Sequence, residues 1–555
     1  MNESTIAKKE WRFVLLFSAV VMIISVLPYL YGFWITPPDK QFMGIHAVNP
    51  GDTYGYIQLI EQAREGKILF NYLSFPEFQQ PTIFHPLFLL MGWFARIFNL
   101  PNIFVYHLFR VLLGFIFLWI SYIFISHFLK DVLKRKIAFV LGALGSGLGW
   151  IFLAAAANQW LAADTYMKEI NNFLAIYESP LDTLGMILML IIFLSFLKLL
   201  KEKQAKYALL CGLEIFLLLT IHPYEALTVL LVLFLYLFYA ITAKKIAVDI
   251  SCAKFLLIIF LISLPGVIYN YYAITYSPAL NFWVKSAVVM SFHPITYLIG
   301  LGLLGLFSLA AIYKIIKEKN SAFYFLLFWI IAGFFLAYQP WVHFQRRFLA
   351  GIEIVFAILA AEGIFIFLRY LKKYFSKTTA EGLILWIIVF TTFSNVAVIK
   401  RDIEYYKMRS WPFYLENDYL NAFDWIKNNA NRNDIILTNR DLAYFIPGIT
   451  GNPIFFGLIV YDQTDYHKNK IAELKWLFES SANEKEKYEF LKEKNIGYFL
   501  YAPESLKITD AQKKGENYEI YYKNYYYDIS NFNPEKISGL KAVYSNKKAT
   551  IYKVE

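Results

Sequence analysis

Residues 11–34 read WRFVLLFSAVVMIISVLPYLYGFW, and the fold follows from apolar runs of this kind. The run exceeds the roughly 20 apolar residues that a membrane helix needs, and it ends in the aromatic residues that favour a membrane–water interface. A cleaved signal peptide would have a shorter apolar core followed by a small-residue cleavage site. We therefore predict a retained first membrane helix that starts in the cytoplasm.

Composition supports a membrane protein. Of 555 residues, 58% are hydrophobic and only 17% are charged, against about 45–50% and 25% in soluble domains. This excludes an ordinary soluble enzyme, a disordered chain and a nucleic-acid-binding domain. The net charge is +11, but residues 400–555 carry 23 Lys+Arg against 22 Asp+Glu, so nearly all of the surplus precedes them. Cys211 and Cys252 both lie in apolar segments, and we expect neither a disulfide framework nor a Cys-ligated metal.

Eleven apolar runs, of which 11–34 is the first, are predicted to span the membrane. They are residues 11–34, 103–129, 137–157, 180–200, 206–221, 223–243, 252–274, 293–316, 321–339, 347–370 and 380–399. The stretch 83–99 is shorter and contains Pro86 and Arg96. If it lies in the interface or re-enters, all basic clusters between the runs fall on one side, as cytoplasmic loops require. The N-terminus is then cytoplasmic and the C-terminus extracytoplasmic.

This orientation places the long connections on the extracytoplasmic side. They are the first outer loop, 35–102, the second outer loop, 158–179, and the tail, 400–555. We therefore predict a polytopic α-helical membrane protein of about 11 transmembrane helices, with a transmembrane domain over 1–399 and a C-terminal extracytoplasmic α/β domain over 400–555.

The tail alternates helix-like and strand-like patterns. Helices are expected over 419–429 and 471–494, strands over 434–437, 453–460 and 497–501, and a hairpin over 540–553. About 155 residues suffice for one small α/β domain.

Asp52 is the most specific acidic candidate. It stands at the start of a helix-like stretch, Thr53–Glu65. As an N-cap, it would accept bonds from the free N–H groups of the first turn. As a functional group, it would be a base at the membrane surface that accepts a proton from an acceptor hydroxyl or amide.

The second outer loop supplies Asp164 and Glu169, close to Asn171 and Asn172. Such oxygen ligands suit a divalent cation, Mg²⁺ or Mn²⁺, which would offset the charge of a phosphate leaving group. The alternative is a pair of solvated loop acids.

Three arginines could bind phosphate oxygens with their planar fork of donors. Arg110 lies two turns into the second span, whereas Arg346 and Arg347 open the tenth. For the latter two, an alternative is that they snorkel to lipid headgroups.

Histidine precedes proline at the predicted outer ends of apolar segments, as in His85-Pro86 and His222-Pro223, with Glu225 following. Such residues could line a pocket, or they could simply mark helix starts, where proline is favoured. No Walker A, GxSxG, HExxH or CxxC pattern occurs, which argues against an ATP-driven pump, an elbow-type hydrolase and a zinc protease.

Taken in order, the motifs resemble the C-type (GT-C) superfamily of integral-membrane glycosyltransferases. This superfamily includes oligosaccharyltransferases, protein O-mannosyltransferases and lipid A aminoarabinose transferases. The matching stretches are GDTYGYIQLIEQAREGK (51–67), FHPLFLLMGWFARIFNLP (84–101), YHLFR (106–110), DTYMKEINNFLAIYESP (164–180), HPYEALT (222–228), QRRFLAGIEIVFAILAAEG (345–363), WIKNNANRNDIIL (425–437) and IPGITGNPIFFGLIVYDQT (446–464).

The resemblance implies transfer of a sugar from a polyprenyl-phosphate donor to a glycan, lipid or protein acceptor on the outer face of the cell membrane. Asp52 would be the catalytic base, and Asp164 and Glu169 would match the acids that hold a metal in some members. The second loop lacks a close pair of acids, however, since these two are five residues apart. The residues matched to substrate binding are Arg110, Arg346, Arg347, His222, Tyr56, His85 and Glu225.

Two other classes stay open. A transporter or flippase of lipid-linked saccharides should show inverted repeats and Gly/Pro-interrupted helices, and the sequence shows neither. A non-catalytic membrane scaffold would bind a partner through its tail and would not need the outer-face acids.

Overall fold

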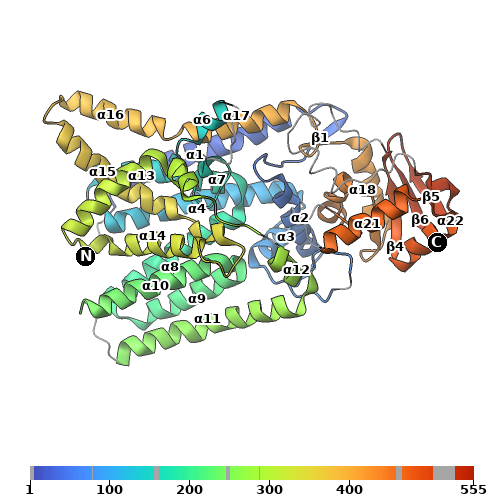
Figure 1. Cartoon of the computed structure of the whole chain (residues 1–555), viewed down its shortest axis with the longest axis horizontal. Helices are drawn as coiled ribbons and strands as arrows, with labels where there is room; N and C mark the ends of the chain where they lie inside the picture. The colour runs from blue at the N-terminus through green and yellow to red at the C-terminus, as the bar shows by residue number, and fades with distance from the viewer. Residues whose placement is uncertain are drawn as a thin grey trace. The chain divides into compact units, whose positions relative to one another are not determined.

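The computed structural model describes residues 6–77, 79–155, 162–244, 250–286, 288–457, 465–503 and 532–555. The chain forms two compact units (Figure 1). Unit 1 comprises Met1–Tyr31, Tyr106–Tyr272 and Val288–Glu404, and unit 2 comprises Gly32–Val105, Ala273–Ala287 and Tyr405–Glu555. The first outer loop is thus grouped with the tail. The predicted domain boundary at 399/400 falls close to the point where the chain enters unit 2, and it remains a prediction.

Unit 1 is a helical membrane unit. Its helices are α1 (Lys8–Trp34), α4 (Asn102–Phe128), α5 (Val132–Leu144), α6 (Gly149–Ala154), α7 (Asn172–Glu178), α8 (Pro180–Glu202), α9 (Ala205–Ile221), α10 (Pro223–Thr242), α11 (Ile250–Tyr276), α13 (Pro294–Lys317), α14 (Tyr324–Ala337), α15 (Ile352–Leu371), α16 (Lys377–Phe390) and α17 (Phe393–Lys407). Short 3-10 turns are η2 (Ala163–Thr165), η3 (Ser321–Phe323) and η4 (Gln345–Leu349).

Within the described residues, nine helical segments are long and apolar enough to cross a membrane. All eleven predicted spans coincide with helices, and the two outside this set, α9 and α14, have 17 and 14 residues. The chain is therefore a multi-pass membrane protein, and the helices α8 to α11 run alongside one another in Figure 1.

The predicted span 137–157 overlaps the candidate span Val132–Ala154, but it is not one continuous helix, and residues 156–157 lie outside the described residues. The chain leaves helical geometry after Leu144, and the N–H groups of Gly147 and Gly149 donate to Asp164 Oδ2 at 2.7 and 3.3 Å. A Cβ on Gly147 would collide with the carbonyl of Gly300. The break is thus stabilised by a distant acceptor and by a close backbone approach, which hydrophobicity does not reveal.

Two more interruptions occur. Helix α13 contains Gly302 at φ 46°, in the left-handed region that glycine tolerates, and the predicted span 380–399 is divided into α16 and α17 at Thr391 and Thr392. These interruptions were not visible in the sequence, and the one in α13 occurs at a glycine.

Unit 2 begins with a short antiparallel sheet that joins the first loop to the tail: β1 (Lys40–Phe42) pairs with β2 (Tyr414–Glu416). Helices α2 (Pro50–Arg64) and α3 (Pro86–Ile97) then pack against each other. They meet at Gly92, where an added Cβ would lie 2.6 Å from the carbonyl oxygen of Ile60. With 12 residues, α3 is about 18 Å long, which agrees with the prediction that 83–99 does not cross the membrane.

The tail folds around a four-stranded sheet in the order β3-β4-β6-β5. The strands are β3 (Ile435–Leu437), β4 (Ile496–Tyr501), β5 (Leu540–Ser545) and β6 (Thr550–Val554), with β3 and β4 parallel and the other neighbours antiparallel. Helices α18 (Asn417–Asn429), α19 (Arg440–Ala443), α20 (Ile446–Thr450), α21 (Asp465–Glu479) and α22 (Glu484–Glu493) accompany it. The predicted helix 419–429, strands 434–437 and 497–501 and hairpin are confirmed.

Two tail predictions are wrong. Residues 471–494 form two helices, because Asn483 caps α22 and forms a reciprocal capping box with Glu486. Residues 453–457 make only an isolated bridge at Ile454 with Ile436, and 458–460 lie outside the described residues.

Candidate active site

A buried group of charged side chains lies in unit 1 where the second loop, the N-terminal ends of α8 and α10, and η4 converge. Its members are Lys168, Glu169, Asp182, His222, Glu225 and Arg347, and we call them the charged cluster. Five of the six side chains are less than one tenth exposed, and Arg347 is 21% exposed. Buried charges are rare without partners, so their pairing decides what this region can bind.

Ion pairs link Asp182 with Lys168 and Arg347, and Arg347 with Glu169. Asp182 lies in the first turn of α8, which Ser179 caps, and its Oδ2 lies 2.9 Å from Lys168 Nζ. Its Oδ1 accepts a hydrogen bond from Arg347 Nη1 at 3.3 Å, and the same nitrogen lies 3.5 Å from Glu169 Oε1. Two cations and two carboxylates thus neutralise each other.

His222 and Glu225 form a second pair, with His222 Nδ1 3.0 Å from Glu225 Oε1. Gly185 makes room for it on α8, since a Cβ there would lie 2.8 Å from the carboxyl carbon of Glu225. Burial alone would lower the pKa of His222, but the carboxylates of Glu225 and Asp182 outweigh it and raise the pKa. The neighbouring carboxylates therefore favour the protonated form of the imidazole.

Arg346 differs from its neighbour. Among the described residues it has no carboxylate partner, and its Nε is buried without a hydrogen-bond acceptor. The guanidinium carbon lies 4.9 Å from the ring centroid of Phe292, which in turn meets the ring of Tyr166 at 5.5 Å. The backbone is fixed as well, because Arg346 N donates to the carbonyl of Val289. A positive charge is thus held against the ring of Phe292, and its buried Nε has no hydrogen-bond acceptor in the described part of the chain.

Asp164 is committed to the backbone. Its Oδ2 accepts from the two glycine amides at the start of α6, and it is fully buried. Burial raises the pKa of this carboxyl to about 6, opposed by hydrogen bonds from Ser394 and from the two amides. Asn171 and Asn172 are also used in packing: the side chain of Asn171 caps α7, and that of Asn172 donates to the carbonyl of Gly142.

The contacts of Asp164 and Glu169 test whether these two acids could hold a divalent cation. Glu169 faces a guanidinium, and one oxygen of Asp164 is occupied by amides. Within the part of the chain that the structure describes, no three His, Cys, Asp or Glu side chains are grouped as metal ligands would be. As arranged, Asp164 and Glu169 do not fit a divalent cation.

Arg110 is completely buried in unit 1, and no carboxylate among the described residues forms an ion pair with it. It donates to Ser25 Oγ and to the carbonyl of Ile176, both at 3.3 Å, and its guanidinium lies over the ring of Tyr29 at 4.7 Å. It ties α4 to α1 and α7, and the phosphate-binding role predicted for it remains a prediction.

Asp52, Tyr56 and His85 lie in unit 2. Asp52 is in the first turn of α2 and is half-buried; the N-cap position belongs to Asn49, so the interpretation of Asp52 as the N-cap is wrong. Tyr56 stacks on Phe88 at 5.3 Å, and His85 stacks on the same ring at 4.2 Å. The two predicted substrate-binding residues therefore share one aromatic neighbour.

The tail secures the helix that carries Asp52. The hydroxyl of Tyr444 donates to the carbonyl of Pro50 and accepts from the N–H of Tyr54 at 3.3 Å. Burial, with a contribution from the nearby carboxylate of Asp52, raises the pKa of Tyr444. Lys427 lies 2.7 Å from Glu61 further along α2. The start of α2 is thus held in place by residues far away in sequence.

The structure brings together four predicted residues, Glu169, His222, Glu225 and Arg347. Sequence reasoning missed Lys168 and Asp182, which join them. Asp182 had a usable signal, because it stands in the first turn of a membrane span, directly after Ser179-Pro180. Lys168 was hidden among the polar residues of the loop.

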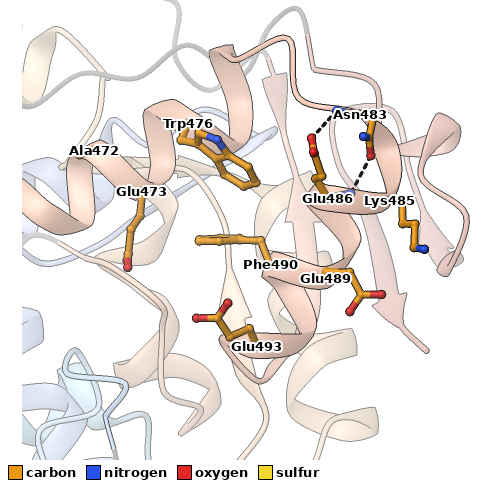
Figure 2. A pocket seen from close by; sticks show the side chains of 9 residues that line it. All are labelled: Ala472, Glu473, Trp476, Asn483, Lys485, Glu486, Glu489, Phe490 and Glu493. Atoms are coloured by element: carbon orange, nitrogen blue, oxygen red, sulfur yellow. Dashed lines mark hydrogen bonds between the residues drawn. The ribbon is translucent and has the colours of Figure 1, made fainter.

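A groove between α21 and α22 in the tail holds none of the predicted residues. Figure 2 shows Trp476 and Phe490 lining it, with rings 5.3 Å apart, and four glutamates around them. Asn483 and Glu486 serve the capping box, and Glu473 pairs with Lys494 at 2.7 Å. These contacts stabilise the helix pair.

No protein-family model and no curated protein sequence matches the chain. Solved structures do. The oligosaccharyltransferase AglB of Archaeoglobus fulgidus, in complex with an inhibitory peptide and a dolichol-phosphate, matches with a TM-score of 0.56 and 14% identity over 90% of this chain and 70% of its own. The arabinofuranosyltransferase AftD from Mycobacteria matches with a TM-score of 0.60 and 11% identity, over 100% of this chain and 40% of its own.

ArnT from Cupriavidus metallidurans, in the apo state, matches with a TM-score of 0.51 and 9% identity over 97% of both chains. At such identities the likeness concerns the fold. The predicted fold class, a polytopic α-helical membrane protein with a C-terminal α/β domain, is confirmed, and these three solved proteins share the fold.

Proposed function

We propose that this protein is a membrane glycosyltransferase. It transfers a sugar from a polyprenyl-phosphate-linked donor to a glycan, lipid or protein acceptor on the extracytoplasmic face of the cell membrane. The N-terminus is cytoplasmic and the C-terminal domain extracytoplasmic. The fold is shared with AglB, solved in complex with an inhibitory peptide and a dolichol-phosphate, and with two further glycosyltransferases.

The observation that carries this proposal is the contrast between Arg346 and Arg347. Arg347 is neutralised by Glu169 and Asp182, whereas Arg346 has a buried Nε without an acceptor and no carboxylate partner in the described part of the chain. A guanidinium in a partly apolar setting needs an anion, and phosphate oxygens match its donors. Arg346 is therefore the residue that we assign to the donor phosphate.

In the reaction, Asp52 accepts the proton of the acceptor nucleophile. The nucleophile forms a bond to the anomeric carbon while the bond from that carbon to the phosphate oxygen breaks, and the sugar configuration inverts. The electron pair leaves with the polyprenyl phosphate, whose added charge Arg346 stabilises. Tyr56, His85, His222 and Glu225 are proposed to line the substrate path, and Arg110 is proposed as a further phosphate contact.

A divalent cation is part of the proposal only as a group that would offset the phosphate charge. A structure of the A. fulgidus enzyme is a complex with Zn and sulfate, and Mg²⁺ or Mn²⁺ would offset phosphate charge if bound. Since Asp164 and Glu169 do not fit such an ion as arranged, no step is assigned to it.

The test is transfer from a panel of radiolabelled polyprenyl-phosphate sugars by purified protein in lipid vesicles, with a membrane extract as the acceptor source. D52N should lose transfer and keep donor binding. D39N is the matched control, because Asp39 is an exposed acid of the same loop, and it should retain transfer. Full transfer by D52N would overturn the assignment. Donor translocation without transfer would favour the flippase class, which the interrupted helices α5/α6 and α13 would then serve.

A further inference from the structure

A tyrosine of the tail contacts the first turn of α2, the helix that carries Asp52. Tyr444 directly follows α19, and its hydroxyl donates to the carbonyl of Pro50 and accepts from the N–H of Tyr54 at 3.3 Å. Resting on the function proposed above, we infer that Tyr444 is a positioning residue, which fixes this turn and thereby aims the Asp52 carboxylate at the acceptor nucleophile.

The two backbone groups that the hydroxyl contacts are four residues apart. In an α-helix, the N–H of each residue donates to the carbonyl of the fourth residue before it, so Tyr54 and Pro50 are such a pair in α2. The Tyr444 hydroxyl bonds to both, and a side chain that enters the ladder in this way sets the local course of the helix. Asp52 lies midway between the two, so the direction of its side chain follows the geometry of this contact.

Packing holds Tyr444 itself in place. It is buried, and its ring lies 5.4 Å from that of Tyr54 and 4.9 Å from that of Phe445. Gly448 lets α20 approach α2, because an added Cβ would lie 2.9 Å from Ile57 Cγ2 and 3.0 Å from Tyr54 Cδ1. The hydroxyl therefore reaches the turn from a rigid support, as a group that positions another one must.

The hydroxyl also keeps the proton that it donates. Burial raises the pKa of Tyr444 well above its ordinary value, and the nearby carboxylate of Asp52 contributes to the rise. The bond to Pro50 thus persists over the pH range in which a carboxylate can act as a base.

Two ion pairs join the tail to the other end of α2. Lys427 Nζ lies 2.7 Å from Glu61 Oε1, and Arg432 Nε lies 2.5 Å from Glu65 Oε1. Both glutamates follow Asp52 by roughly two and a half helical turns or more, so these pairs hold the helix without contacting its first turn. They supply a control, because they stabilise the same helix far from the base.

The experiment measures transfer by the full-length protein in lipid vesicles, with the polyprenyl-phosphate sugars and the membrane extract of the transfer assay above. Y444F removes the hydroxyl and keeps the ring. Because a small misplacement of a catalytic group can cost about a hundredfold in rate, we expect kcat to fall about tenfold or more, with KM for the donor changed by less than about twofold. R432Q is the matched control: it should lower Tm at least as much as Y444F does and leave kcat within about twofold of the wild type.

A double variant separates positioning from general destabilisation. D52E keeps a carboxylate but already misplaces it, so adding Y444F should lower its transfer by less than about twofold, since residues that act as a unit are not additive. A merely structural contact would lower transfer by the same factor in both backgrounds. If Y444F does not fold, G448A is the second test: its Cβ would press on Tyr54 and Ile57, and it should also lower kcat more than it raises KM.

The outcomes separate this inference from the proposed function. Wild-type transfer, with D52N inactive and Y444F folded and fully active, overturns the inference and leaves the glycosyltransferase proposal standing. An effect of Y444F that appears only in KM, or that R432Q reproduces in kcat, overturns the inference as well. A wild type that transfers no sugar from any donor of the panel overturns the proposed function instead.

Discussion

The substitution Arg347→Gln tests whether Arg347 neutralises buried carboxylates of the protein or binds the phosphate of a ligand. The sequence predicts that Arg347 contacts phosphate, whereas the structure gives it two carboxylate partners at 3.3 and 3.5 Å. Those carboxylate side chains are only 9% and 8% exposed. Replacing Arg347 leaves Glu169 without an ion-pair partner among the described residues, and Asp182 keeps its ion pair with Lys168.

Breaking a buried ion pair from one side costs about 3–5 kcal/mol. We expect the lower end, about 3 kcal/mol, because the Arg347 side chain is 21% exposed and Asp182 keeps Lys168. The assay is thermal unfolding in detergent micelles, where a loss of this size lowers Tm by several degrees. The control R369Q, at an exposed arginine, should change stability by less than about 0.5 kcal/mol.

The double variant R347Q/E169Q should recover part of the loss, about 1–2 kcal/mol, because the unpaired carboxylate is then gone. The reasoning is refuted if R347Q is as stable as R369Q while affinity for a polyprenyl-phosphate sugar collapses. Arg347 would then be a ligand-binding arginine, as the sequence alone indicated.

Three further predictions concern other parts of the molecule. G92A should destabilise unit 2 by about 1–3 kcal/mol in thermal unfolding, because its Cβ would lie 2.6 Å from the Ile60 carbonyl oxygen. The control G55A on α2, whose Cβ would have nothing within 4 Å, should stabilise unit 2 by about 0.5–1 kcal/mol. Equal effects of the two substitutions would contradict the packing of α3 on α2. D164N tests the raised pKa of Asp164: the stabilising contribution of this carboxyl should be greatest below about pH 4 and fall by about 3 kcal/mol as pH rises through 6. D164N should remove this part of the slope in pH-dependent unfolding while leaving any Mn²⁺ binding unchanged. Y444F removes the hydroxyl that joins Pro50 and Tyr54, so about 1 kcal/mol of stability should be lost and kcat should fall more than donor affinity; a loss of donor affinity alone would speak against a role at Asp52.

The membrane helices could be predicted from the sequence because their signal is local. Every predicted span coincides with one helix or, at 137–157 and 380–399, with two, since a run of apolar residues is visible without knowing its neighbours. The break after Leu144 could not be predicted, because it depends on Asp164 in the following loop and on the approach of Gly300 to Gly147. The same distant contact occupies Asp164 Oδ2, and the sequence, which does not reveal it, predicts Asp164 as a metal ligand.

The candidate site was predictable in part. Residue type and position indicated Glu169, His222, Glu225 and Arg347, which the structure brings to one place. Pairing was not predictable, because the difference between Arg346 and Arg347 arises from which side of η4 meets Asp182 and which meets Phe292. The contacts of Tyr444 with α2 were equally hidden, since its partners lie in the first loop.

The central claim is that Arg346 binds the phosphate of a lipid-linked sugar donor. The most direct measurement is a cryo-EM structure of the full chain in lipid nanodiscs with a polyprenyl monophosphate glucose. We predict density for the phosphate within hydrogen-bond distance of Arg346 Nε, with the Arg347–Asp182 contact intact. A phosphate bound elsewhere, with Arg346 facing only Phe292 and lipid, would contradict the account.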